Sequence, residues 1–131
     1  PFMQSVGLVG KESVVVELTG VFDDGAMINA IDASAFDGLK DRLCPLVPSG
    51  RRMRMADGRL VPSLGVWEGD VSLGGVGGVG GRAKFEVFHS GGAWSLLFGK
   101  PLLRSFRATH SYDTDMVEVP RADGSTLILS N

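Results

Sequence analysis

Apolar residues along the chain either form short runs or alternate with polar residues, a pattern typical of β-strands. The run at residues 94–98 is apolar apart from Ser95, so we expect that strand to be buried on both faces. Residues 65–73 alternate, which predicts a strand with one buried and one exposed face. In all, the pattern predicts strands over residues 12–22, 26–31, 52–56, 59–64, 65–73, 83–88, 94–98, 109–119 and 125–129.

Two segments carry helical signals instead. Asp32 can cap a main helix over residues 33–43, and Pro45 ends it. Pro101 suits the first turn of a short C-terminal helix over residues 102–106. The chain is therefore predicted to be mainly β, a closed barrel with one main helix and one short helix.

Glycine marks the turns between the expected strands. Asp57-Gly58 lies between two extended segments and predicts a hairpin. The glycine run at residues 74–81 lacks the Lys-Ser/Thr pair of a phosphate-binding loop. We interpret this run as a connector between two strands and expect it to be mobile.

Length and composition narrow the possible functions. The 131 residues suit a single domain, residues 1–131, and the chain begins at Pro1, which is typical of a piece of a longer protein. The net charge of -2 gives no basic surface for nucleic acid, and no apolar run is long enough to cross a membrane. Cys44 is the only cysteine, so we expect a reducing compartment, the cytoplasm. His89 and His110 are too few and too far apart in sequence to indicate a metal site.

Two adjacent carboxylates, Asp23 and Asp24, directly follow the first apolar strand. Gly25 and Ala26 come next, and such small residues let the backbone turn sharply and approach another chain closely. Burial of an ionised carboxylate is unfavourable unless it is paired, so this position indicates a chemical role. A plain hairpin turn at Asp24-Gly25 is the alternative that this stretch alone leaves open.

Two later segments favour the chemical role. One is the Asp57-Gly58 hairpin, and the other is the apolar strand, glycine and short helix of Leu96-Leu-Phe-Gly-Lys-Pro-Leu-Leu103. With the Asp-Asp-Gly-Ala loop, these segments resemble the retropepsin-like aspartic proteases of retroviruses and of long-terminal-repeat retrotransposon polyproteins, or a cellular protein derived from one. That family has Asp-Ser/Thr-Gly-Ala in the first motif and Gly-x-x-Leu-Leu in the last. The resemblance covers about residues 12–119.

The resemblance implies a closed β-barrel and an aspartic endopeptidase that acts as a homodimer, with no cofactor and no metal. Asp23 would be the catalytic carboxylate, one from each chain, on a loop that Asp24 and Gly25 complete. Two carboxylates a few ångströms apart cannot both ionise, so they share a proton and activate a water between them.

Substrate contacts are also implied by the resemblance. Ala26 and Met27 would contact an extended peptide, and the hairpin Ala56-Asp57-Gly58 would be the flap that covers it. The peptide would bind by adding a strand. Retroviral proteases carry acidic residues shortly after the alanine, and this chain lacks them. The glycine run at residues 74–81 is a second candidate for the flap, but its late position in the chain favours an ordinary hairpin.

This chain has Asp24 where the family has Ser or Thr. In the family that hydroxyl donates a hydrogen bond to the partner chain near the two-fold axis, whereas an ionised Asp only accepts. Two copies of Asp24 would add like charges at the axis, so we expect the dimer and its activity to be favoured at acid pH. Asp24 is itself an alternative catalytic residue, although Asp23 keeps the Asp-x-Gly spacing.

Two functions are compatible with these features. The first is an endopeptidase that cuts a retroelement polyprotein, in the cytoplasm or within a retroelement particle. The second is a catalytically impaired domain of the same fold that serves as a dimerisation or peptide-binding module. A β-barrel of unrelated function, in which Asp24-Gly25 is only a turn, is a third and remoter alternative.

Overall fold

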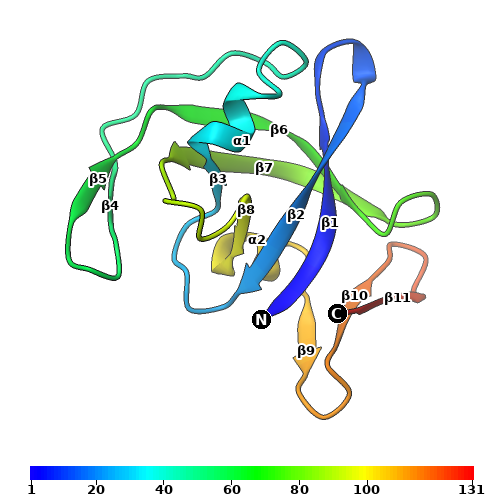
Figure 1. Cartoon of the computed structure of the whole chain (residues 1–131). Helices are drawn as coiled ribbons and strands as arrows, with labels where there is room; N and C mark the ends of the chain where they lie inside the picture. Colours follow the sequence, from blue (N-terminus) through cyan, green and yellow to red (C-terminus); the bar gives the residue numbers. More distant parts are fainter.

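Six strands form a closed barrel in the computed structural model, which describes all residues from Pro1 to Asn131 (Figure 1). Around the barrel the strands follow the order β1 (Phe2–Val9), β2 (Val15–Asp23), β8 (Leu96–Gly99), β3 (Ala30–Asp32), β7 (Val79–Phe88) and β6 (Val66–Leu73), and β6 pairs again with β1. The predicted mainly β fold with a closed barrel is confirmed.

The pairing of β2 with β8 is the part of the barrel that matters most for the site. These strands run parallel, and Asp23 lies opposite Gly99 in their register. The strand that ends in the two carboxylates and the strand that ends in the later glycine motif therefore finish side by side. The order of the motifs in the sequence is compatible with two neighbouring strands. It does not show which residues of the two strands lie opposite each other.

Alternating side chains fill the barrel. In β6, Trp67, Val71 and Leu73 are buried while Glu68 and Asp70 are exposed, as the sequence pattern predicts. The main core comprises 22 buried residues that come from nearly every strand. A second, smaller apolar cluster lies apart from it and consists of Ala30, Phe88 and Leu97.

Both helices are short. α1 spans Ala33–Asp37 and α2 spans Lys100–Ser105, and neither is long or apolar enough to cross a membrane. The main helix predicted over residues 33–43 is wrong in its extent. Gly38, a poor helix former, follows α1 directly, and only hydrogen-bonded turns continue as far as Arg42.

A separate three-stranded sheet forms the C-terminal part of the chain. Its strands are β9 (Thr109–Ser111), β10 (Met116–Pro120) and β11 (Thr126–Ser130), with β10 in the middle. The single strand predicted over residues 109–119 is wrong, because a turn at residues 112–115 divides it. Valines of β10 and leucines of β11 pack into the main core, so this sheet is fixed against the barrel.

The strands of the structure differ from those of the sequence pattern in three other places. The strand β1 is not predicted by the sequence pattern, yet it pairs with β2 along its whole length and closes the barrel. The strand expected over residues 26–31 is reduced to β3, because the chain before Ala30 forms a loop. The connector expected over residues 74–81 is shorter, since β7 already begins at Val79. A short 3-10 turn at Lys11–Ser13 links β1 to β2.

Candidate active site

The two carboxylates lie on a tight loop at the end of β2, and both are exposed. The Oδ1 atom of Asp23 accepts a hydrogen bond from the backbone N–H of Gly25 at 2.9 Å. The Asp23 carbonyl oxygen accepts a second bond from the N–H of Ala26 at 3.2 Å. The loop therefore turns around the Asp23 carboxylate and holds it by its own backbone.

Gly99 allows α2 to begin directly against this loop. A Cβ atom at Gly99 would lie only 2.0 Å from the carbonyl oxygen of Ile28, so no other residue fits without a shift of the backbone. The N–H of Lys100, at the start of α2, donates to the carbonyl oxygen of Ala26 at 2.8 Å. The glycine motif at residues 96–103 therefore packs against the loop that carries Asp23 and supports it.

Asn29 is a buried polar residue that braces the same loop. Its Oδ1 atom accepts a hydrogen bond from the N–H of Gly99 at 3.1 Å, and its Nδ2 atom donates to the carbonyl oxygen of Lys84 at 3.2 Å. One side chain thus links the loop to β8 and β7. Sequence reasoning did not select Asn29, although an amide inside the apolar run of residues 27–31 was a signal.

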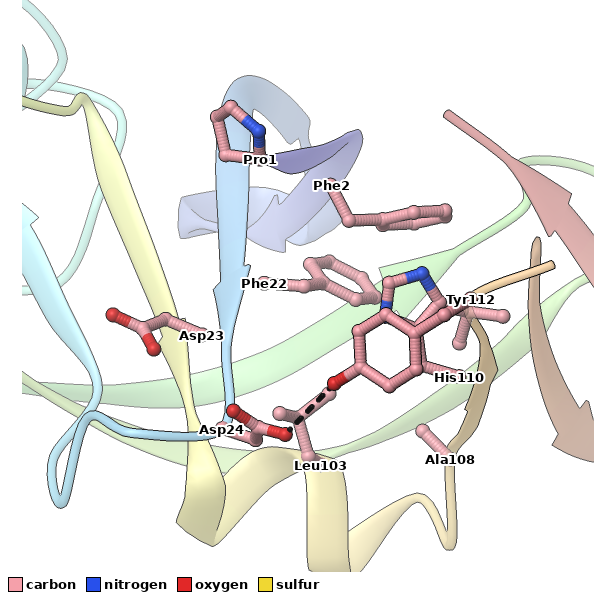
Figure 2. Close-up of a pocket in the computed structure, with 10 residues that line it drawn as sticks. Pro1, Phe2, Phe22, Asp23, Asp24, Leu103, Ala108, His110 and Tyr112 are labelled. Carbon is pink, nitrogen blue, oxygen red and sulfur yellow. Dashed lines mark hydrogen bonds between the residues drawn. The ribbon is translucent and has the colours of Figure 1, made fainter. Parts of the chain in front are cut away.

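A cavity of about 300 Å³ opens beside the carboxylates (Figure 2). Aromatic rings form much of its wall: the Phe2 and Phe22 centroids lie 5.4 Å apart, and the Phe2 and His110 centroids 5.1 Å apart. Its lining contains no lysine or arginine. The lining residues are Pro1, Phe2, Phe22, Asp23, Asp24, Leu103, Ala108, His110, Tyr112 and Val117.

Asp24 has a partner within its own chain. The hydroxyl of Tyr112 donates a hydrogen bond to Oδ2 of Asp24 at 3.3 Å, as Figure 2 shows. The Tyr112 ring also packs against His110, with 4.3 Å between their centroids. The residue that departs from the resembled family is therefore held by the C-terminal part of the chain.

The C-terminal residue Asn131 anchors this region to the start of β1. Its side chain accepts a bond from the N–H of Met3 at 2.9 Å and donates to the carbonyl oxygen of Pro1 at 2.9 Å. It also donates to Asp115, which in turn bonds His110 at 2.9 Å. Hydrogen bonds from Asn131 and His110 hold the pKa of Asp115 below its usual value.

The predicted hairpin at Asp57-Gly58 is present. Its strands are β4 (Arg52–Arg54) and β5 (Leu60–Pro62), and it extends to one side of the barrel (Figure 1). Met53 and Val61, which are paired in the hairpin, pack with Ala26 and Ile28 around the smaller apolar cluster. The base of the hairpin therefore shares an apolar surface with the loop that carries Asp23.

The tip of the hairpin is open to solvent. Ala56, Asp57 and Gly58 are all exposed, and none of them lines a cavity with Asp23. A hydrogen-bonded contact of 2.6 Å joins Asp57 to Arg59, and bonds from Arg59 lower the pKa of Asp57. Gly58 has a φ of 87°, a value that favours glycine. Their role as a flap stays a prediction.

Met27 does not line the aromatic cavity. It lines a second cavity of about 350 Å³ together with Ile28, Asn29 and the hairpin residue Arg51, among others. Of the predicted site residues, the structure thus gathers Asp23, Asp24, Gly25, Ala26 and Met27 on one loop. It leaves the hairpin tip separate.

Sequence reasoning did not select Tyr112 and His110, which line the cavity with the carboxylates, or Asn131, which is linked to His110 through Asp115. Tyr112 lies 88 positions after Asp24. No motif links the two residues, so only the tertiary structure reveals their contact. The catalytic and substrate-binding roles of the predicted residues stay predictions.

The closed six-stranded barrel with its two short helices has the retropepsin-like fold. A solved structure that shares this fold is the crystal structure of the retroviral protease-like domain of Ddi1 from Leishmania major. The two structures superpose with a TM-score of 0.62 over 99% of this chain and 94% of that one, at 14% sequence identity. By sequence, the chain matches no known family profile and no curated protein.

Proposed function

We propose that this chain is an aspartic endopeptidase that acts as a homodimer. The observation that carries the proposal is the exposed Asp23 carboxylate, held on a tight loop at the end of a barrel strand and supported by Gly99. One chain supplies one such loop. The second carboxylate would come from an identical chain across a two-fold axis.

The reaction would be hydrolysis of a peptide bond by an activated water. The two Asp23 carboxylates would share one proton, so that one acts as base toward the water and the other as acid toward the peptide carbonyl. An extended peptide would lie between the catalytic loop and the β4–β5 hairpin, where Ala26, Met53 and Val61 offer an apolar surface. Met27 would contact the peptide next to this apolar surface. The natural substrate would be a retroelement polyprotein.

A catalytically impaired module of the same fold is the second candidate. The observation that favours it is Asp24, which occupies the Ser/Thr position of the resembled motif and bonds to Tyr112 of its own chain. Such a module would dimerise or bind peptides without cleaving them.

Cleavage of an unstructured protein at pH 4 to 6 separates these candidates. We expect the native chain to cleave and Asp23→Asn to lose activity by at least about a thousandfold, because the shared proton and the base disappear together. Asp24→Asn tests the neighbouring carboxylate and should lose far less activity than Asp23→Asn. Equal cleavage by the native chain and Asp23→Asn would contradict the proposal, and no cleavage by either would favour the module.

A further inference from the structure

Tyr112 is an exposed aromatic residue with a defined position. Its side chain stands at the rim of the aromatic cavity, and the residue is 74% exposed in the single chain (Figure 2). Its ring packs on His110, and its hydroxyl reaches Asp24. A large ring in so open a position is the kind of residue that becomes covered when a partner binds.

The strand before Tyr112 is fixed independently of Asp24. His110 packs against Phe2 and bonds Asp115, and Asn131 bonds both Asp115 and the start of β1. The Tyr112 hydroxyl is therefore presented by a braced segment rather than by a free chain end. A group held in this way can orient its partner.

In the proposed dimer, Asp24 would need such a donor. It forms no salt bridge, and the titratable side chains that line the cavity with it are Asp23, His110 and Tyr112. In the proposed dimer, two ionised Asp24 side chains near the axis would repel each other. Among these neighbours, the Tyr112 hydroxyl is the donor that bonds Asp24.

We infer that Tyr112 is a positioning residue, which draws the Asp24 carboxylate toward the C-terminal sheet and so lets two catalytic loops approach across the axis. This inference rests on the proposed function and deepens it. It explains how a chain with Asp in place of Ser or Thr keeps a competent loop. The hydrogen bond that the family's hydroxyl donates to the partner chain is replaced by a bond that Asp24 accepts within its own chain.

A double-mutant cycle tests the inference. The four proteins are the native chain, Tyr112→Phe, Asp24→Thr and the double variant, each assayed for kcat and KM at concentrations that saturate the dimer. Tyr112→Phe removes one hydroxyl and should lower kcat by about tenfold with little change in KM, since it loses a bond to a charged group. In the Asp24→Thr background the same change should alter kcat less than about twofold.

Ser111→Ala is the matched control, because it removes an exposed hydroxyl from the position next to Tyr112, at the end of β9, that has no hydrogen bond to the Asp23 loop. It should leave kcat unchanged. An equal loss from Tyr112→Phe in both backgrounds would show a merely structural role and overturn the inference. No loss in either background would overturn it as well.

The dimer dissociation constant, measured by analytical ultracentrifugation on the same four proteins, gives the cycle a second readout. We expect Tyr112→Phe to weaken the dimer by about tenfold only where Asp24 is present. This readout decides the inference even if no variant cleaves. Conversely, if Asp23→Asn is as active as the native chain, the proposed protease fails whatever the cycle shows.

Discussion

At the scale of single residues, Gly99 is a position beside the Asp23 loop that leaves no room for a side chain. The carbonyl oxygen of Ile28 occupies the space that any side chain would need, and the N–H of Gly99 is already bonded to Asn29. A substitution must therefore push the Asp23 loop away from α2. The stability of the fold and the geometry of the Asp23 loop therefore both depend on the close contacts of Gly99 with Ile28 and Asn29.

We predict that Gly99→Ala lowers the free energy of unfolding by about 2–4 kcal/mol, because the added methyl group forces a backbone shift in a packed region. Urea unfolding followed by fluorescence measures the change. Gly50→Ala is the control, since a Cβ atom there meets nothing within 4 Å. Similar stabilities for the two variants would contradict the predicted clash.

The residues that the sequence could predict are those with a local signal. Asp23 and Gly99 stand in short motifs whose chemistry limits the residue type. Asn29 and Tyr112 act through partners 70 and 88 positions away, and a single sequence does not show such contacts. The sequence therefore indicates the loop that carries Asp23, but not the groups that brace it.

At the scale of elements, α1 depends on the cap at its N-terminus. The Asp32 carboxylate accepts bonds from the N–H of Ala35 at 3.2 Å and from the N–H of Ser90 at 2.9 Å. Partial burial alone would raise the pKa of Asp32, but hydrogen bonds from Ser90, Ala35 and Ser34 outweigh it and lower the pKa. One carboxylate thus ties α1 to the segment that follows β7.

The lowered pKa of Asp32 predicts a pH dependence of stability. The stabilisation is present above the unfolded-state pKa of about 3.9 and is lost as the pH falls through the folded-state value. Asp32→Asn keeps an amide oxygen that can cap α1 but cannot titrate. We therefore expect the free energy of unfolding to fall more steeply between pH 5 and 2 for the native chain than for this variant. Parallel curves would argue against a role for Asp32.

The β4–β5 hairpin offers a second test at this scale. Met53 contacts the apolar cluster beside the catalytic loop, whereas its neighbour Arg52 is exposed. If the hairpin covers a peptide, Met53→Ala should raise KM by about five- to tenfold through lost apolar contact, and Arg52→Ala should change it little. Peptide cleavage kinetics measure both. A larger effect at Arg52 would point to charge rather than packing as the basis of substrate binding.

The lengths of the elements show where sequence patterns reach their limit. Alternation in β6 identifies a strand and its buried face correctly. The same reasoning overextends α1, because apolar residues at helical spacing can also face the core from successive turns, as Leu39 and Leu43 do. It misses β1, which forms a strand because it pairs with β2 on one side and β6 on the other.

At the scale of the whole molecule, the proposed active species is a pair of identical chains. Its activity should therefore be sensitive to an inactive partner. With Asp23→Asn added in tenfold excess and allowed to exchange, cleavage should fall about tenfold, because few native chains then find a native partner. An unrelated protein added in the same excess serves as the control for added protein. Undiminished cleavage would indicate that a single chain suffices.

The contact between Asn131 and the first residues of β1 also bears on the connectivity of the chain. Both ends lie next to each other, as Figure 1 shows, and Val76 stands fully exposed in the loop between β6 and β7. A few added residues could join the ends, and the ring could then be opened at Val76. We predict that such a circular permutant folds and keeps its activity, which circular dichroism and the cleavage assay would measure. The fold would then not depend on the order in which the strands are synthesised. The same junction could also link two copies of the chain covalently.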